Sequence, residues 1–388
     1  MIKNTWPNFS SEEIDAVREV LLSGKVNYWT GDNTKSFEKE FAEYCGTKYA
    51  IALSNGTVAL ELALKAIGIK ENDEVIVTPR SFIASVSSVV NMGAKPVFVD
   101  IDLETQNIDP KQFKEKISSN TKAIIAVHLA GLPCNMDEIM KISNQNEIIV
   151  IEDCSQAHGA EYKGKPVGSI GHIGCWSFCQ DKIISTGGEG GMVTTNNSFF
   201  WNKIWSYKDH GKDFNVIKNQ NNKGSFNWVH SSFGSNFRMT EMQSVIGRIQ
   251  LRKLNEWQEK RSKNLSFIYE KAKKIDGLIV PIVPDYVKHG AYRCYLFVDQ
   301  KMLKEGWSRD RIIDEVKNFD VPCFSGSCPE IYLEKAFENT DFKPKNRLKN
   351  AKLVGEISIA FLTHPNLTFE ELNHSCSVLS NVMQMAIK

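Results

Sequence analysis

The feature that most constrains the fold is a repeated alternation of short β-branched runs with helical patterns between residues 49 and 151. The pattern predicts strands at 49–53, 74–77, 96–99, 123–127 and 148–151, with helices at 57–66, from about 84, and near 136–142. This alternation is typical of a largely parallel sheet with helices on its faces. Ligands of such sheets bind at the carboxyl ends of the strands, so we expect the chemistry at the residues that follow each strand.

The length and the later part of the chain predict two domains. A chain of 388 residues, of which 42% are hydrophobic, suffices for two or three domains of ~150 residues each. A long, charged helical pattern at 242–274 is followed by a shorter region that Pro281, Pro284, Gly290 and Pro322 interrupt. We therefore predict a large domain at 1–255 and a smaller domain at 256–388.

Composition and charge exclude several classes of protein. The 47 Lys and Arg residues against 46 Asp and Glu leave a net charge of +1, and hence no field that would hold nucleic acid or an anionic membrane. The nine cysteines form no C-x-x-C pair, which argues against a disulfide framework or a zinc ribbon, and no histidine motif predicts a metal site. No stretch approaches the ~18 apolar residues of a membrane span, nor does the start of the chain form a signal peptide. We expect a cytoplasmic protein.

Two strand ends carry groups suited to a phosphate and to a cation. Ser54-Asn55-Gly56-Thr57 joins a strand to a helix, where glycine permits close backbone approach and the helix N-terminus offers free N–H groups to a phosphate. An ordinary capped turn is the alternative. Glu152-Asp153 directly follows the strand at 148–151, and a helix cap or a structural ion pair is the alternative to a catalytic acid there.

Two further segments offer an amine and an aromatic ring. Lys182 lies between Ser177 and the glycine-rich run at 187–191. Burial beside such a turn would lower the pKa of the lysine and make its amine reactive, whereas a solvated surface lysine is the alternative. Phe82 follows the strand at 74–77, and packing in the core is its alternative.

These four features together match the needs of one cofactor, pyridoxal 5'-phosphate. That cofactor requires an amine for its Schiff base, a carboxylate opposite its ring nitrogen, a phosphate cradle and a flat hydrophobic face. Lys182, Asp153, the Ser54–Thr57 turn with Ser177, and Phe82 fill those roles in turn.

Ordered motifs continue along nearly the whole chain. They include Phe37-Glu38, the runs 93–100, 127–131, 151–159, 171–175 and 188–191, His210-Gly211 and Asn236-Phe237-Arg238-Met239. With the four features above, they resemble the DegT/DnrJ/EryC/StrS family of pyridoxal-phosphate-dependent nucleotide-sugar aminotransferases of fold type I. The resemblance implies an aspartate-aminotransferase-like α/β fold, with a mostly parallel seven-stranded sheet between helices in the large domain and a smaller C-terminal α+β domain.

The resemblance also implies roles for individual residues. Lys182 would be the Schiff-base lysine and proton carrier, and Asp153 the partner of the ring nitrogen. The other implied cofactor contacts are Gln156 and Phe82 at the ring, Gly56, Thr57 and Ser177 at the phosphate, and Asn236 at the phosphate of the neighbouring subunit. The last contact implies a homodimer with shared active sites, although isolated amides such as Gln156 and Asn236 are more often turn or cap residues.

Four residues are candidate substrate contacts. Arg80 stands where the family suggests an uncharged residue, so it would meet a substrate diphosphate or else face solvent. Trp29, in an unusually aromatic stretch, would form a wall of the sugar or nucleotide pocket or else pack between the domains. His128 and Arg293 are further candidates, each with a structural alternative.

The implied reaction transfers an amino group in two halves. L-glutamate would leave its nitrogen on the cofactor as pyridoxamine 5'-phosphate, which would then aminate a nucleotide-linked keto-deoxysugar. We favour a 4-keto-6-deoxyhexose, and a product for O-antigen, lipopolysaccharide or another surface polysaccharide or glycan.

Several alternatives stay open. The enzyme could aminate a 3-keto sugar. It could also be a sugar dehydratase of the same fold, although the resemblance implies a histidine in place of Lys182 in the dehydratases of this family. A non-catalytic regulator would have lost the lysine, the acid or the phosphate turn. The sequence does not support a nicotinamide-dependent oxidoreductase. The dinucleotide-binding fingerprint is G-x-G-x-x-G, whereas the glycines at 168–174 are spaced G-x-x-G-x-x-G.

Overall fold

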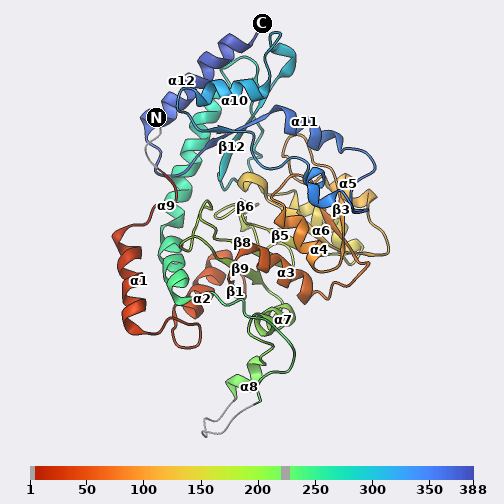
Figure 1. Ribbon diagram of the computed structural model, residues 1–388, viewed down its shortest axis with the longest axis vertical. Helices are drawn as coiled ribbons and strands as arrows, with labels where there is room; N and C mark the ends of the chain where they lie inside the picture. Colours follow the sequence, from red (N-terminus) through yellow and green to blue (C-terminus); the bar gives the residue numbers. More distant parts are fainter. Residues whose placement is uncertain (1–4, 220–227) are drawn as a thin grey trace.

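Seven strands form the central sheet in the computed structural model, which describes residues 5–219 and 228–388 (Figure 1). In the order in which they lie side by side, the strands are β1 (Tyr49–Leu53), β9 (Gly191–Thr195), β8 (Ile173–Ser177), β5 (Ile149–Asp153), β4 (Thr121–Val127), β2 (Glu74–Val77) and β3 (Lys95–Phe98). Strand β9 is antiparallel to β1 and β8, and the pairs from β8 to β3 are parallel. The predicted mostly parallel seven-stranded sheet is confirmed.

Helices cover both faces of this sheet because its strands are apolar on both sides. In β4, Ala123, Ile125 and Val127 enter one core while Ile124 and Ala126 enter the opposite one, as the two-residue period of a strand requires. The first core is covered by α3 (Gly56–Ala66), α4 (Ala84–Asn91) and α7 (Ser198–Lys208). The opposite face is covered by α2 (Asn33–Cys45), α5 (Pro110–Glu115), α6 (Met136–Gln145) and part of α9 (Glu241–Ala272).

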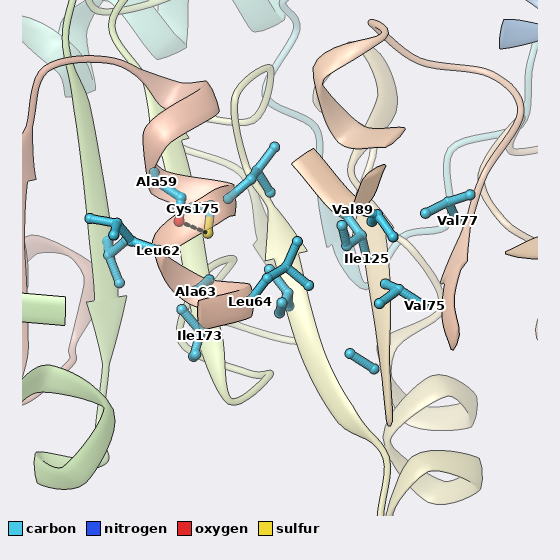
Figure 2. Packing of buried hydrophobic residues seen from close by; sticks show 14 of the residues in the cluster. Ala59, Leu62, Ala63, Leu64, Val75, Val77, Val89, Ile125, Ile173 and Cys175 are labelled. Carbon is cyan, nitrogen blue, oxygen red and sulfur yellow. Dashed lines mark hydrogen bonds between the residues drawn. The ribbon is translucent and has the colours of Figure 1, made fainter. Parts of the chain in front are cut away.

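Small side chains bring α3 close to the sheet. Figure 2 shows Ala59 and Ala63 of α3 next to Ile173 and Cys175 of β8. The Cys175 thiol donates a hydrogen bond of 3.4 Å to the carbonyl oxygen of Ala59, so little space separates helix from strand. This close packing holds the N-terminus of α3 beside the end of β8.

The second part of the chain builds a smaller antiparallel sheet. Its strands lie in the order β10 (Leu278–Ile279), β12 (Arg293–Val298), β14 (Ser358–Leu362) and β13 (Cys323–Phe324). Helices α10 (Arg309–Lys317), α12 (Phe369–Ala386) and the C-terminal half of α9 share its core, at the top of Figure 1. This is the expected smaller α+β domain.

The long helix α9 belongs to both parts of the molecule. It packs against α1 (Ser11–Ser23) and α2 near its start and against α12 and β12 near its end. The predicted boundary after residue 255 falls inside this continuous helix. In addition, Ile331, Tyr332 and Phe337, late in the chain, pack in the core of the large sheet.

The remaining short elements lie around these two sheets. They are β6 (Glu161–Tyr162), β7 (Lys165–Pro166) and β11 (Val287–Lys288), which form a third sheet, with α8 (Phe214–Lys218), α11 (Lys349–Ile357) and the 3-10 turns η1 (Leu129–Gly131), η2 (Gln300–Met302), η3 (Ile331–Leu333) and η4 (Lys335–Phe337). Within the described ranges, no helix is both long and apolar enough to cross a membrane.

The first residue of α9 ties the helix to α2. The fully buried Glu241 carboxylate accepts hydrogen bonds from the backbone N–H groups of Asn33 (2.6 Å) and Thr34 (3.0 Å) and from the Thr34 hydroxyl (2.6 Å). Free N–H groups at a helix start favour a negative charge. Glu241 therefore caps α2 from a position about 200 residues along the chain.

We expect Glu241→Gln to destabilise the protein by about 1.5–3 kcal/mol, because the amide cannot accept all three hydrogen bonds and lacks the charge. The measurement is the denaturant-unfolding midpoint. The control is Glu259→Gln, an exposed position on the same helix, which should leave the midpoint unchanged. Equal midpoints for the two variants would contradict this role of Glu241.

Candidate active site

A buried carboxylate organises the end of the central strand β5. The Glu152 side chain is fully buried and accepts hydrogen bonds from the backbone N–H groups of Gly168 (2.9 Å), Ile170 (2.9 Å) and Gly171 (2.6 Å). Since successive side chains of a strand point to opposite faces, the next residue, Asp153, points to the other side of the sheet. The structural role of Glu152 leaves Asp153 as the acid available for chemistry.

Asp153 lines a cavity of about 550 Å³ at the carboxyl ends of the strands. The cavity brings together seven of the predicted cofactor residues: Gly56, Thr57, Phe82, Asp153, Gln156, Ser177 and Lys182. These residues come from different strand ends of the first half of the chain. A larger cavity, of about 640 Å³, lies between α3, α7 and α8 and, among the described residues, is lined by none of these seven.

One end of the cavity is suited to an anion. Asn55 caps α3 by accepting the N–H of Val58 (2.9 Å), which leaves the first N–H groups of the helix, those of Gly56 and Thr57, without an intrahelical partner. A Cβ atom on Gly56 would lie 2.7 Å from the Ser177 Cβ atom, so only glycine fits there. A helix N-terminus beside a serine hydroxyl is a cradle for a phosphate.

Another part of the cavity is suited to a protonated ring. Asp153 is only 4% exposed; its Oδ2 accepts a hydrogen bond from the Ser85 hydroxyl (2.8 Å) and its Oδ1 accepts one from the backbone N–H of Ser155 (3.1 Å). These bonds hold the carboxylate in place. Gln156 is fixed by accepting the N–H of Ala130 (2.8 Å), whereas Phe82 is 67% exposed at the rim.

Lys182 lies largely buried in the same cavity, with its Nζ 3.3 Å from Oδ1 of Asp181 and 5.2 Å from the centre of the Tyr292 ring. Burial by itself would lower the pKa of the ammonium group, but Tyr292 and Asp181 outweigh burial and raise that pKa above its usual value. The sequence-based expectation of a lowered pKa is therefore wrong for this state of the protein. The causes are Tyr292 and the carboxylate of Asp181, the residue before this lysine in the chain.

A contact that the sequence did not reveal holds the backbone of this lysine. The indole N–H of Trp6 donates a hydrogen bond of 2.7 Å to the carbonyl oxygen of Lys182. Trp6 also packs edge-on against Trp257, stacks on His364 and lies 4.9 Å from the Arg261 guanidinium. Trp6 is 176 residues from Lys182, so no local pattern could indicate the contact.

A second cavity, of about 350 Å³, adjoins the first and shares Ser81, Phe82, Gln156, Asp181 and Lys182 with it. Arg293 lines this cavity, in line with the expectation of a substrate contact, together with residues of the smaller domain. The second cavity is therefore lined by both parts of the molecule and includes Lys182.

Arg80 lies in the core rather than at the surface. It is 1% exposed and donates hydrogen bonds to Gln106 (3.1 Å) and Ser358 (3.1 Å), with its guanidinium 5.3 Å from the centre of the Tyr295 ring. The solvent-facing alternative is wrong. Since Arg80 is buried and lines neither cavity, a direct contact with a substrate diphosphate is not supported.

The structure also corrects the predictions for His128 and Trp29. His128 is fully buried, donates to Glu152 (3.0 Å) and accepts from the N–H of Cys134 (3.0 Å), so neither ring nitrogen is available to a substrate. Trp29 lies outside both cavities, where its indole N–H donates to Asp209 (2.7 Å) and its ring packs against Trp205 of α7. That packing is within the large domain, not between domains.

Asn236 is exposed and does not line the cavity that contains Lys182. It pairs with Asp209 in an isolated β-bridge. Phe233, three residues earlier, is 99% exposed. Within one chain, the predicted phosphate contact of Asn236 is therefore not made.

A mostly parallel sheet with a buried lysine, a carboxylate on the central strand and a helix N-terminus in one cavity is the arrangement of pyridoxal-phosphate enzymes of fold type I. A profile of the DegT/DnrJ/EryC1/StrS aminotransferase family matches residues 7–380, and the chain belongs to this family.

Known proteins agree with this assignment. The chain is 52% identical to an aminotransferase from Psychrobacter cryohalolentis, whose crystal structure matches with a TM-score of 0.97 over 98% of this chain and 99% of that one. It is 34% identical to GDP-perosamine synthase of Caulobacter vibrioides over 97% of each protein. Protein Spr1654 of Streptococcus pneumoniae, solved in its PLP form, shares 25% identity with a TM-score of 0.88 over 99% of each chain.

The cofactor of this family is pyridoxal phosphate, and the site fits it. The phosphate cradle exists because Gly56 has no Cβ atom, and the buried Asp153 carboxylate is held ready for a cation. The Lys182 amine lies in the same cavity.

We expect Gly56→Ala to weaken binding of pyridoxal phosphate by about tenfold or more, because the added methyl group forces Ser177 out of the cradle. The measurement is titration of the cofactor-free protein by absorbance. Lys65→Ala, at an exposed position in the last turn of the same helix, serves as the control. The same affinity in both variants would show that the cradle does not hold the phosphate.

Proposed function

We propose that the protein transfers the amino group of L-glutamate to a nucleotide-linked keto-deoxysugar, with a 4-keto-6-deoxyhexose as the favoured acceptor. The observation that carries the proposal is the meeting of the Lys182 amine, the Asp153 carboxylate and the free N-terminus of α3 in one cavity. The likeness to GDP-perosamine synthase over 97% of the chain supports a nucleotide-sugar substrate. The product would serve surface-polysaccharide or glycan synthesis in the cytoplasm.

The bound cofactor supplies an electron-withdrawing ring and carries the amino group between the two substrates. Asp153 holds the proton on the ring nitrogen, because its buried carboxylate would otherwise face the cavity without a positive partner. Gly56, Thr57 and Ser177 bind the phosphate group. Lys182 moves a proton at its Nζ atom to and from the reacting carbon.

The second cavity would receive the sugar nucleotide. It opens directly beside Lys182 and presents the Arg293 guanidinium. Arginine suits a phosphate or carboxylate oxygen, since its planar fork donates two parallel hydrogen bonds. Arg293 also lies 5.0 Å from the Tyr292 ring centre and 5.8 Å from that of Phe324, which restricts its position.

We propose a homodimer in which Asn236 of each subunit completes the phosphate site of the other. Two observations support a contact with a second copy. Asn236 is exposed and lies outside the Lys182 cavity of its own chain, and Phe233, three residues earlier, is 99% exposed. The exposed Phe82 at the cavity rim fits the same idea, because a large ring at a monomer surface gains from being covered.

The alternatives are a 3-keto acceptor, a dehydratase of the same fold, and a regulator without activity. The amine of Lys182 argues against the dehydratase. The intact lysine, acid and phosphate cradle argue against the regulator.

We expect the purified protein to show the near-visible band of lysine-bound pyridoxal phosphate and to lose it when L-glutamate is added. Lys182→Ala should lack the lysine-bound form, and Asp153→Ala should reduce turnover at least about a hundredfold while the fold persists. Absorbance spectra and circular dichroism measure these outcomes. Near-full activity of Asp153→Ala, or a protein that ignores every amino donor, would overturn the proposal.

The shared site predicts complementation between two inactive variants. Lys182→Ala mixed with Asn236→Ala should recover up to about a quarter of wild-type activity, because half of the dimers are mixed and one site in each mixed dimer is intact. The measurement is transaminase activity after co-refolding or co-expression. No recovery, with mixed dimers present by native mass spectrometry, would rule out the contribution of Asn236 across the interface.

A further inference from the structure

Asp181 makes the closest ionic contact of the reactive lysine. One carboxylate oxygen lies 3.3 Å from the Lys182 Nζ atom, and the other accepts a hydrogen bond from the Tyr292 hydroxyl. The same tyrosine ring lies 5.2 Å from that Nζ atom. The three groups therefore form one connected cluster, in which the carboxylate is held from both sides.

The cluster spans the two parts of the molecule. Asp181 precedes Lys182 on the loop after β8, whereas Tyr292 directly precedes β12 of the smaller domain. The backbone N–H of Tyr292 donates to the carbonyl oxygen of Ala130 (3.0 Å), which ties the tyrosine to the large domain. Its ring is 7% exposed, so it offers Asp181 a hydroxyl in a fixed position.

The charges in the cluster support one another. Burial would raise the pKa of Asp181, but the charge of Lys182 and the hydrogen bond from Tyr292 lower it below the usual value. Burial raises the pKa of Tyr292, so its hydroxyl keeps its proton and donates it. The carboxylate is thus ionised at neutral pH and favours the ammonium form of Lys182.

We propose that Asp181 is a positioning residue for Lys182, an inference that rests on the proposed function. Held in place by Tyr292, Asp181 keeps the free Lys182 amine protonated and directs it to the junction of the two cavities. Both cavities are lined by Asp181 and Lys182. The free lysine then rests in its ammonium form between steps and is neutral only while it takes a proton from the reacting carbon. A substrate entering the second cavity meets Asp181, Tyr292 and Arg293 together, so its binding is linked to the protonation of Lys182.

Several other charged or titratable groups surround Lys182. Those that face the lysine or line its cavities are Cys179, His158, Asp153, Glu189 and Arg293. Asp153 accepts hydrogen bonds from Ser85 and Ser155. Among the described residues, Asp181 is the carboxylate that forms an ion pair with Lys182.

The test measures how readily the Lys182 amine reacts with a small amine-directed reagent as a function of pH, in the full-length protein freed of cofactor. Peptide mass spectrometry reports the modified fraction of Lys182. Only the neutral amine reacts with the reagent, and in the wild-type protein the amine is held in its charged form. Lys182 should therefore react only above the pH at which an ordinary exposed lysine reacts. Asp181→Asn should lower the midpoint pH by about 1 to 3, since an opposite charge at this distance shifts a pKa by that amount.

Further variants separate a role in charge from a role in structure. Asp181→Glu keeps the negative charge, so its midpoint pH should lie between those of Asp181→Asn and the wild type. Tyr292→Phe should lower the midpoint pH less than Asp181→Asn does. Asp15→Asn, at an exposed position on α1, should match the wild type. Circular dichroism verifies that each variant is folded. A midpoint in Asp181→Asn equal to the wild-type midpoint would overturn the inference.

The result is separable from the proposed function. If the wild-type protein fails to bind pyridoxal phosphate or to react with any amino donor, the proposed function fails, whatever the midpoint of Lys182. If the protein transaminates but Asp181→Asn does not move the midpoint, only the positioning role fails. In the holoenzyme, the pH dependence of recovery of the lysine-bound absorption band gives a second readout of the same shift.

Discussion

The Glu152 carboxylate accepts three backbone N–H groups from residues 168–171 and the ring N–H of His128, all inside the protein. A buried carboxylate without these partners would cost several kcal/mol, so strand β5, the turn before β8 and the segment after β4 are held together around it. Asp153, the next residue, thereby points into the cavity from a fixed strand end. The position of Asp153, the acid proposed to serve the cofactor, therefore depends on the structural carboxylate of Glu152.

The site combines groups from distant parts of the chain, each held for a separate reason. The phosphate cradle exists because Gly56 allows α3 to approach Ser177. Lys182 is held through its backbone by Trp6 and through its ammonium group by Asp181. The smaller domain contributes Tyr292, which orients Asp181. A cavity that combines an anion cradle, a cationic amine and the carboxylates of Asp153 and Asp181 suits a reaction that moves an amino group and a proton.

Part of the fold could be predicted from local patterns, and so could seven residues that the structure brings together in one cavity. The strands at 74–77 and 123–127 could be predicted because buried parallel strands are continuous apolar runs. Residues that line the cavity directly follow the strand at 49–53 and the predicted strand at 148–151. Burial was not predictable. Arg80 and His128 have the chemistry of substrate contacts, yet partners as distant as Ser358 in one case and Glu152 in the other enclose them. The contact of Trp6 with Lys182 leaves no pattern in the sequence at all.

The sequence by itself determined the alternation of strands and helices between residues 49 and 151, the glycine of the turn before α3, and the lysine and acid proposed for the cofactor site, because these follow from residue type and short spacing. Only the tertiary structure decided which side chains reach the cavity and how they are charged there. The pKa of Lys182 shows the difference: burial alone predicts a lowered value, whereas Asp181 and Tyr292 raise it. The reason is physical, since burial and Coulomb interactions depend on distances that folding sets.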